Sequence, residues 1–180
     1  MSKIWNLPNI LSIFRLLLII PLGLALWNNE NLIAVLLGFL SAITDNLDGY
    51  FARRFNQITE FGKKIDPLAD KLLIGVIVVI LFVQQRIDFW FFLLILARDL
   101  ILLIGGLIIS KKLKWVIPSD WVGKITVTIL GLTLMFIMLN ATTITKYAII
   151  CSSITLLYSF VHYVIRALYF LKKYNENGKN

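Results

Sequence analysis

Four aspartates within a 26-residue stretch are the residues of this chain most able to do chemistry. Asp45 and Asp48 are three residues apart, and Asp66 and Asp70 are four apart, so each pair lies on one face if its segment is helical. Carboxylates gathered in a medium of low dielectric constant repel one another unless a cation neutralises them. Oxygen ligands suit Mg²⁺ or Mn²⁺. The spacing predicts a divalent-cation site with room for two ions.

Small residues and a base accompany these acids. Gly49 and Ala52 continue the helical face of the first pair, and Gly62 precedes the second pair, so little side-chain bulk blocks access to the carboxylates. Arg53 lies at the edge of the same face and offers a planar set of donors that matches a phosphate group. Acids for metal, small residues for access and an arginine for phosphate indicate metal-assisted phosphoryl chemistry.

The complete pattern resembles a known signature, that of the CDP-alcohol phosphotransferases. The matching positions are Asp45-x2-Asp48-Gly49-x2-Ala52-Arg53-x8-Gly62-x3-Asp66-x3-Asp70. The opening of the chain also resembles the branch that makes phosphatidylglycerophosphate and cardiolipin, through Asn6-Leu-Pro8-Asn9-Ile-Leu-Ser12-Ile-Phe-Arg15. Asp66-Pro-Leu-Ala-Asp70-Lys71 is similar to the same branch.

The resemblance implies an enzyme that displaces CMP from CDP-diacylglycerol with an alcohol, and it implies a homodimer. It implies that two divalent ions, Mg²⁺ or Mn²⁺, are held by Asp45, Asp48, Asp66 and Asp70. It implies that the CDP moiety is received by Gly49, Ala52, Arg53 and Gly62. Asp70 is similar to the carboxylate proposed as the general base on the acceptor hydroxyl, and Asp66 is expected beside it.

The acceptor is read from the fourth apolar segment. Arg98-Asp99 interrupts this segment, and because adjacent helical residues do not face each other, we expect separate partners for them, with an acceptor phosphate for Arg98. The branch that uses glycerol 3-phosphate resembles this chain less here, since Asp99 replaces the expected Glu and Gly105 and Gly106 replace a second arginine. The resemblance favours phosphatidylglycerol (cardiolipin synthesis), with glycerol 3-phosphate (phosphatidylglycerophosphate synthesis) as the alternative. An inositol-type acceptor is less favoured, and a serine-type acceptor stays open.

Composition sets the class of fold. The 180 residues are 59% apolar and only 16% charged, with a mean hydropathy of +0.84, which argues against a soluble domain and against a disordered chain. One cysteine excludes an internal disulfide framework. We therefore expect an all-α, polytopic membrane protein: a single domain over residues 1–180, built as a six-helix transmembrane bundle with its active site on the cytoplasmic side. The expected spans are 9–27, 31–53, 67–85, 88–110, 121–140 and 145–170.

Basic residues set the expected orientation. They concentrate on alternate connections between the spans, so the positive-inside rule predicts that both termini are cytoplasmic. The net charge of +8 is then explained by topology and anionic lipid headgroups rather than by nucleic acid. The chain lacks an Arg/Ser-rich presequence, which favours a bacterial plasma membrane.

Short connections should bring the second and third spans side by side, so that the four carboxylates converge. The start of the third span has two interpretations, because proline prefers the first turn of a helix. Either one helix carries Gly62, Asp66 and Asp70 on a single face, or Asp66 caps a helix that begins at Pro67. A cation transporter is the rival function, since carboxylates inside membranes also mark ion pathways.

Overall fold

The computed structural model describes residues 6–54, 62–113 and 121–177. Within these ranges, only the backbone is described for residues 7–8, 46, 49–53, 63–64, 66–67, 107–113 and 171–177.

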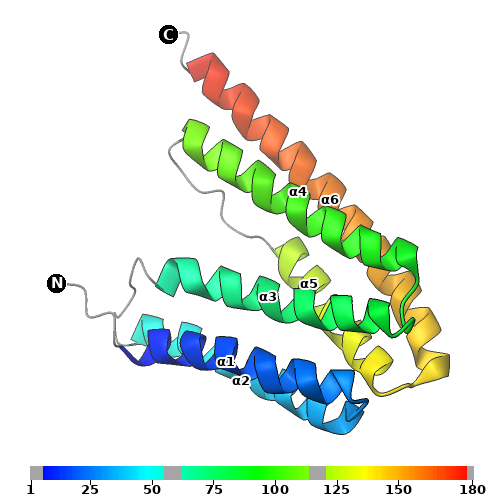
Figure 1. Ribbon diagram of the computed structural model, residues 1–180. Helices are drawn as coiled ribbons and strands as arrows, with labels where there is room; N and C mark the ends of the chain where they lie inside the picture. Colours follow the sequence, from blue (N-terminus) through cyan, green and yellow to red (C-terminus); the bar gives the residue numbers. More distant parts are fainter. Residues whose placement is uncertain (1–5, 55–61, 114–120, 178–180) are drawn as a thin grey trace. The chain divides into compact units, whose positions relative to one another are not determined.

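The described residues form six helices and no strand, which confirms the expected all-α architecture (Figure 1). The helices are α1 (Leu7–Trp27), α2 (Asn31–Arg54), α3 (Gly62–Val83), α4 (Phe89–Leu113), α5 (Trp121–Met138) and α6 (Thr142–Asn177). The third helix begins at Gly62 and runs through Pro67, so Gly62, Asp66 and Asp70 belong to one continuous helix and Asp66 is not its N-cap.

The chain divides into two compact units, which are described separately. The first comprises Met1–Arg86 with Ile137–Asn140, and the second comprises Ile87–Phe136 with Ala141–Asn180. Within the first unit, α1 packs along both α2 and α3. Within the second unit, α4 packs on α6, and α6 also accepts hydrogen bonds from α5: Thr133 Oγ1 donates to the carbonyl of Ala148 at 3.2 Å. The helix α1 is therefore the element that joins the two acid-bearing helices.

The start of α1 is set by local capping. Asn6 has extended backbone angles, and its side chain accepts a hydrogen bond from the backbone N–H of Asn9 at 3.0 Å. Pro8 stands in the first turn, where a helix tolerates the missing N–H. This cap fixes the helix register and, with it, the face of α1 that Ser12 and Arg15 share.

Three short connections end their preceding helices in the same way. Asn29, Gln85 and Asn140 each have a positive φ, between 55° and 60°. The next N–H in each case bonds to a carbonyl five residues earlier, as in Glu30 N to Ala25 O at 2.8 Å. This is the Schellman arrangement, in which a left-handed residue lets the chain satisfy the last helix carbonyls and turn back. The left-handed residue permits connections this short.

Arg86 joins these connections within the first unit. Its Nη2 donates to the carbonyls of Ile137 and Met138 at 2.5 and 2.8 Å and to the side chain of Asn140 at 2.7 Å, while Nη1 donates to Asn31 Oδ1 at 2.9 Å. Burial lowers the pKa of the Arg86 guanidinium below its usual value, but arginine remains protonated in proteins. The end of α5 is therefore tied to the α3–α4 connection and to the start of α2.

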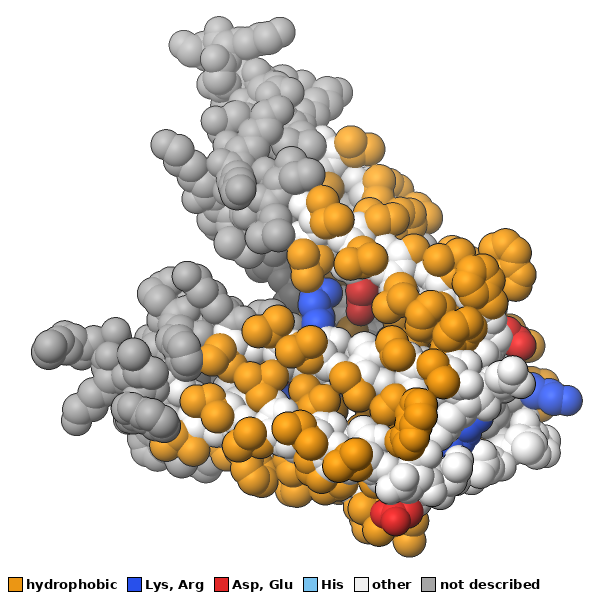
Figure 2. Space-filling view, in the orientation of Figure 1, with side chains coloured by type: hydrophobic (Ala, Val, Ile, Leu, Met, Phe, Trp, Pro, Cys, Tyr) orange, Lys and Arg blue, Asp and Glu red, His pale blue; other side chains and the backbone are white. Residues whose placement is uncertain are grey.

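The surface is that of a membrane protein. Four helical segments of the described residues are long and apolar enough to cross a bilayer: Asn9–Trp27, Phe89–Gly106, Trp121–Met138 and Thr142–Phe170. The apolar run of α2, Asn31–Asp45, is shorter, and α3 carries Asp66, Asp70 and Lys71 near its start. Apolar side chains cover much of the face in Figure 2, and soluble monomers rarely expose such patches. The protein is thus a multi-pass membrane protein, and the four motif aspartates lie on α2 and α3, the two helices without such a span among the described residues.

Candidate functional site

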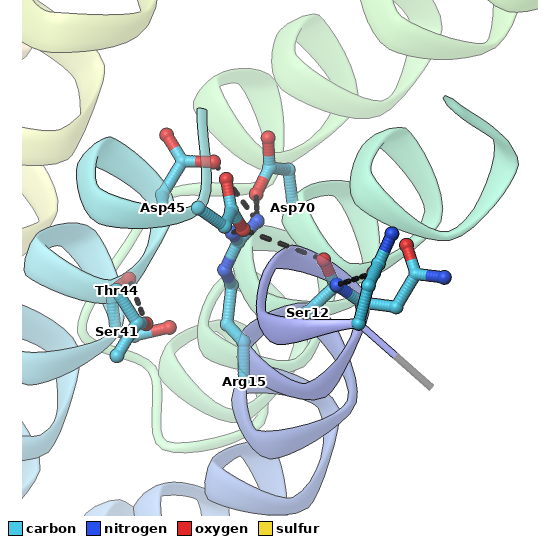
Figure 3. A network of polar contacts seen from close by, with 9 residues as sticks. Ser12, Arg15, Ser41, Thr44, Asp45 and Asp70 are labelled. Atoms are coloured by element: carbon cyan, nitrogen blue, oxygen red, sulfur yellow. Dashed lines mark hydrogen bonds and ion pairs between the residues drawn. The ribbon is translucent and has the colours of Figure 1, made fainter. Parts of the chain in front are cut away.

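Arg15 of α1 is the centre of a polar cluster in the first unit (Figure 3). The residue has no exposed surface. Its Nη1 lies 3.0 Å from Asp45 Oδ1 and also pairs with Asp70 Oδ1, while Nη2 pairs with Asp48 Oδ2. One guanidinium therefore contacts three of the four predicted site aspartates.

Three helices position these side chains. Asp45 and Asp48 are three residues apart on α2, so they project from one face, and Asp70 comes from α3. Arg15 reaches both helices because α1 packs against each of them. Ser12, one turn earlier on α1, has its Oγ 3.4 Å from Asp48 Oδ2 and donates to it. The carboxylates of α2 and α3 converge through their common partner on α1.

The cluster is closed on one side and open on the other. The side chain of Asp48 is only 5% exposed, whereas those of Asp45 and Asp70 are 46% and 47% exposed. Three carboxylates against one guanidinium leave an excess of negative charge among these four side chains. A ligand that approaches from the open side therefore meets Asp45 and Asp70 and an environment that favours cations.

The donor set fits a divalent cation. Carboxylate oxygens are the ligands preferred by Mg²⁺ and Mn²⁺, and these carboxylates already share one cationic partner. Across residues 6–54, 62–113 and 121–177, no group of three or more acidic, histidine or cysteine side chains surrounds a common ion position. The guanidinium of Arg15 stands where the three carboxylates meet.

The other predicted site residues are placed only in part. Gly62 is buried at the start of α3. The remaining predicted site residues lie on α2 and α3, but their side chains are not described: Gly49, Ala52, Arg53 and Asp66. Their roles stay predictions.

Arg15 was missed as a site residue by reasoning from the sequence, which used it only as part of the opening motif. Helix α1 supplies one base to the acids, and this single guanidinium still leaves the three carboxylates in excess. The signal was available: an arginine within an otherwise apolar span, with Leu or Ile on most sides, is costly in lipid and needs a partner.

Arg98 lies in the second unit and is also buried, with 8% of its surface exposed. Its Nη1 is 2.5 Å from Asp99 Oδ1, so the expectation of separate partners for these adjacent residues is wrong: the long arginine side chain folds back onto its neighbour. Its Nη2 donates to Ser159 Oγ on α6 at 3.2 Å. Whether it meets an acceptor phosphate stays a prediction.

Comparison with known proteins gives consistent matches. The sequence profile of the family described as CDP-alcohol phosphatidyltransferase matches residues 5–165. A protein of Aquifex aeolicus named "CDP-diacylglycerol--glycerol-3-phosphate 3-phosphatidyltransferase" is 38% identical over 89% of this chain and 95% of its own length. A Rickettsia felis protein of the same name is 46% identical over 57% of each chain. A Mycobacterium tuberculosis protein named "Probable phosphatidylglycerophosphate synthase" is 35% identical over 69% of this chain and 61% of its own length.

Proposed function

Because this chain belongs to the CDP-alcohol phosphatidyltransferase family, we propose that it transfers the phosphatidyl group of CDP-diacylglycerol to a glycerol-based acceptor and releases CMP. The observation that carries this proposal is the convergence of Asp45, Asp48 and Asp70 from two helices at one half-open site. Such a site can neutralise and orient a pyrophosphate only with bound cations, which is the chemistry that phosphoryl transfer requires.

We propose glycerol 3-phosphate as the acceptor, which makes the product phosphatidylglycerophosphate. Relatives from three genera carry names that specify this acceptor or this product, and one of them aligns over 95% of its own length. These names favour the alternative over phosphatidylglycerol, the acceptor that the sequence around Arg98 favours. The alignment to the Rickettsia felis relative spans 57% of that protein, so its activity is transferred here as a proposal.

Divalent cations, Mg²⁺ or Mn²⁺, are the implied cofactor. Two ions would be held by Asp45, Asp48, Asp66 and Asp70. When bound, they would neutralise the pyrophosphate and stabilise the CMP leaving group. The CDP moiety is assigned to the small and basic positions of the motif, Gly49, Ala52, Arg53 and Gly62, because these leave access beside the acids and offer a phosphate donor.

The chemical step is a displacement at the phosphatidyl phosphorus. The acceptor hydroxyl oxygen forms a new bond to this phosphorus, and the phosphorus–oxygen bond to CMP breaks. Asp70 takes the hydroxyl proton as general base, a role that its half-exposed side chain permits. Asp48, almost fully buried beside Arg15 and Ser12, orients the cluster rather than meeting the acceptor.

The membrane setting suits a lipid donor. The acyl chains of CDP-diacylglycerol would stay in the bilayer against the apolar faces of the helices, while the cytidine lies at the surface near the acids. We infer from the distribution of basic residues that this surface is the cytoplasmic side of the membrane, with both termini cytoplasmic, and we propose that this membrane is a bacterial plasma membrane. A homodimer is the assembly that we expect.

The test is a direct assay of purified protein in detergent or nanodiscs. Labelled CDP-diacylglycerol is incubated with Mg²⁺ or Mn²⁺ and with either glycerol 3-phosphate or phosphatidylglycerol, and CMP and lipid products are separated. We expect CMP and phosphatidylglycerophosphate with glycerol 3-phosphate. If only phosphatidylglycerol yields a product, and that product is cardiolipin, the acceptor is phosphatidylglycerol and not glycerol 3-phosphate. If neither acceptor releases CMP and the protein carries metal ions into liposomes, the proposed enzyme function is wrong and the protein is a cation transporter.

A further inference from the structure

The position of Arg15 has a consequence for cation binding. Its guanidinium occupies the meeting point of Asp45, Asp48 and Asp70, and the residue has no exposed surface. A buried arginine is stable only when anions surround it, and three like charges are stable together only when a cation lies between them. Each partner in this cluster thus requires the other.

We propose that Arg15 is an internal counter-cation that holds these three carboxylates together without a divalent ion and competes with that ion for their oxygens. The inference rests on the proposed function only in taking the ligand of this site to be a divalent cation. It makes Arg15 a positioning residue of the site, acting through the aspartates.

The pairing geometry indicates that Arg15 competes with a divalent ion for the carboxylate oxygens and does not merely hold them in place for it. Nη1 is shared between Asp45 and Asp70, which lie on different helices, and Nη2 takes Asp48. A divalent ion bound by the same oxygens would lie close to this positive charge and be repelled by it. The ion can enter because Asp45 and Asp70 are each about half exposed, and it must then draw those oxygens from Nη1.

Unused hydrogen-bonding capacity lies beside the cluster. Among the described residues, Arg15 Nε and Ser41 Oγ are buried without a hydrogen-bond partner. Ser41 lies on α2 one turn before Asp45, on the helix face of the acids. Buried polar atoms are normally paired, so this arrangement leaves part of the guanidinium and a neighbouring hydroxyl unsatisfied. A shifted Arg15, displaced by an ion, would have capacity for new partners.

Competition predicts opposite signs for two measurements. Arg15→Met removes the positive charge, so the variant should lose thermal stability in EDTA because three carboxylates are left unneutralised. The same variant should bind Mn²⁺ about tenfold more tightly or better, because the repulsion is gone. A residue that merely supported the metal site would weaken Mn²⁺ binding when removed.

The experiment measures Mn²⁺ alone, by electron paramagnetic resonance of the free ion, with purified full-length protein in detergent. Thermal unfolding is followed in EDTA and in saturating Mn²⁺. Arg15→Met should regain in Mn²⁺ most of the stability it loses in EDTA. Arg15→Lys, which keeps a charge without the planar fork, should fall between the wild type and Arg15→Met in Mn²⁺ affinity, and it decides the question if the methionine variant does not fold.

Arg98→Met is the matched control, since Arg98 is another buried arginine paired with an aspartate. It should lose stability without tightening Mn²⁺ binding. Equal or weaker Mn²⁺ binding by the folded Arg15 variants would overturn the inference, as would an absence of Mn²⁺ binding in every variant. CMP release is measured separately, so a wild type that binds Mn²⁺ in competition with Arg15 but releases no CMP would overturn the proposed function alone.

Discussion

Arg15 of α1 and Asp48 of α2 form an ion pair that is closed on both sides, with side chains 1% and 5% exposed. The same guanidinium also meets Asp45 and Asp70, whose side chains are about half exposed. The cluster thus combines a buried anchor with two accessible carboxylates. Asp48 therefore differs in role from Asp45 and Asp70, although all three belong to one sequence motif.

Asp48→Asn should lower the free energy of unfolding more than Asp45→Asn does. The amide could not form the charge-assisted bond that Asp48 makes to Arg15 in the buried part of the cluster, and because Arg15 keeps two other partners we expect a loss of about 2 kcal/mol. Asp45 is half exposed, so its change should cost about 1 kcal/mol or less. Thermal or SDS unfolding in EDTA measures both, and equal losses would contradict the anchor role.

The sequence predicts much of this arrangement and fails where helix packing decides. Apolar runs and short polar connections identify all six helices, because a bilayer demands long apolar helices. The largest differences are at the start of α3, which is Gly62 where 67 is predicted, and at the end of α6, which is Asn177 where 170 is predicted. Asp45, Asp48 and Asp70 come together on Arg15 of α1, which packs on both α2 and α3. Among the described residues, this differs from the direct α2–α3 packing that the short connections predict.

The partner of these acids could not be predicted from spacing alone. Arg15 joins them because α1 packs against both α2 and α3, and helix spacing gives no information about which helix is the common neighbour. The pairing of Arg98 with Asp99 was also missed, since the rule for adjacent helical residues describes Cβ directions and not the reach of a long side chain.

Asp70→Asn and Asp66→Asn should each abolish turnover. An amide cannot accept the acceptor proton or supply an anionic oxygen to a cation, so we expect CMP release to fall by about 10³-fold or more. Asp88→Asn is the matched control, because Asp88 is an exposed aspartate in the α3–α4 connection. Retained activity in either site variant, at unchanged thermal stability, would count against the assigned base and ligands.

Arg98→Lys tests the assignment of the acceptor phosphate. If Arg98 meets this phosphate, loss of the planar fork should raise the KM for glycerol 3-phosphate by about tenfold and change the KM for CDP-diacylglycerol by less than about twofold. Ser159→Ala removes one partner of Arg98 and should have a smaller effect of the same kind. A loss of stability with both KM values unchanged would make Arg98 a structural residue of the α4–α6 contact.

Arg86→Met should destabilise the protein without changing the chemistry directly. Five acceptors lose their donor, among them the last carbonyls of α5, and we expect a loss of about 3 kcal/mol. Gln84→Met is a milder comparison, because Gln84 donates to two terminal carbonyls of α1, those of Leu26 at 2.8 Å and Trp27 at 3.3 Å, and accepts from Arg86 Nη1 at 3.4 Å. The KM values of folded Arg86→Met should match those of the wild type, and unfolding measurements that rank Gln84→Met as the more damaging change would contradict this ranking.

Gly123→Ala tests the close approach of α5 to α6 in the second unit. A Cβ at Gly123 would collide with Tyr163 Oη and lie 3.2 Å from Tyr163 Cζ, so the ring must move. Overpacking of this kind costs about 1–3 kcal/mol, which exceeds the gain of about 1 kcal/mol that alanine brings to a helix. Gly131→Ala is the matched control on the same helix, because nothing lies within 4 Å of its added Cβ, and it should stabilise.

The rescue variant is Tyr163→Phe, which removes the oxygen nearest to the added methyl group. The double variant Gly123→Ala with Tyr163→Phe should therefore lose less free energy of unfolding than the sum of the losses in the two single variants. Thermal unfolding of the four proteins completes the cycle. Strict additivity would show that the α5–α6 contact relaxes around the methyl group without involving Tyr163. A Gly123→Ala variant as stable as Gly131→Ala would contradict the close approach of Tyr163 to Gly123.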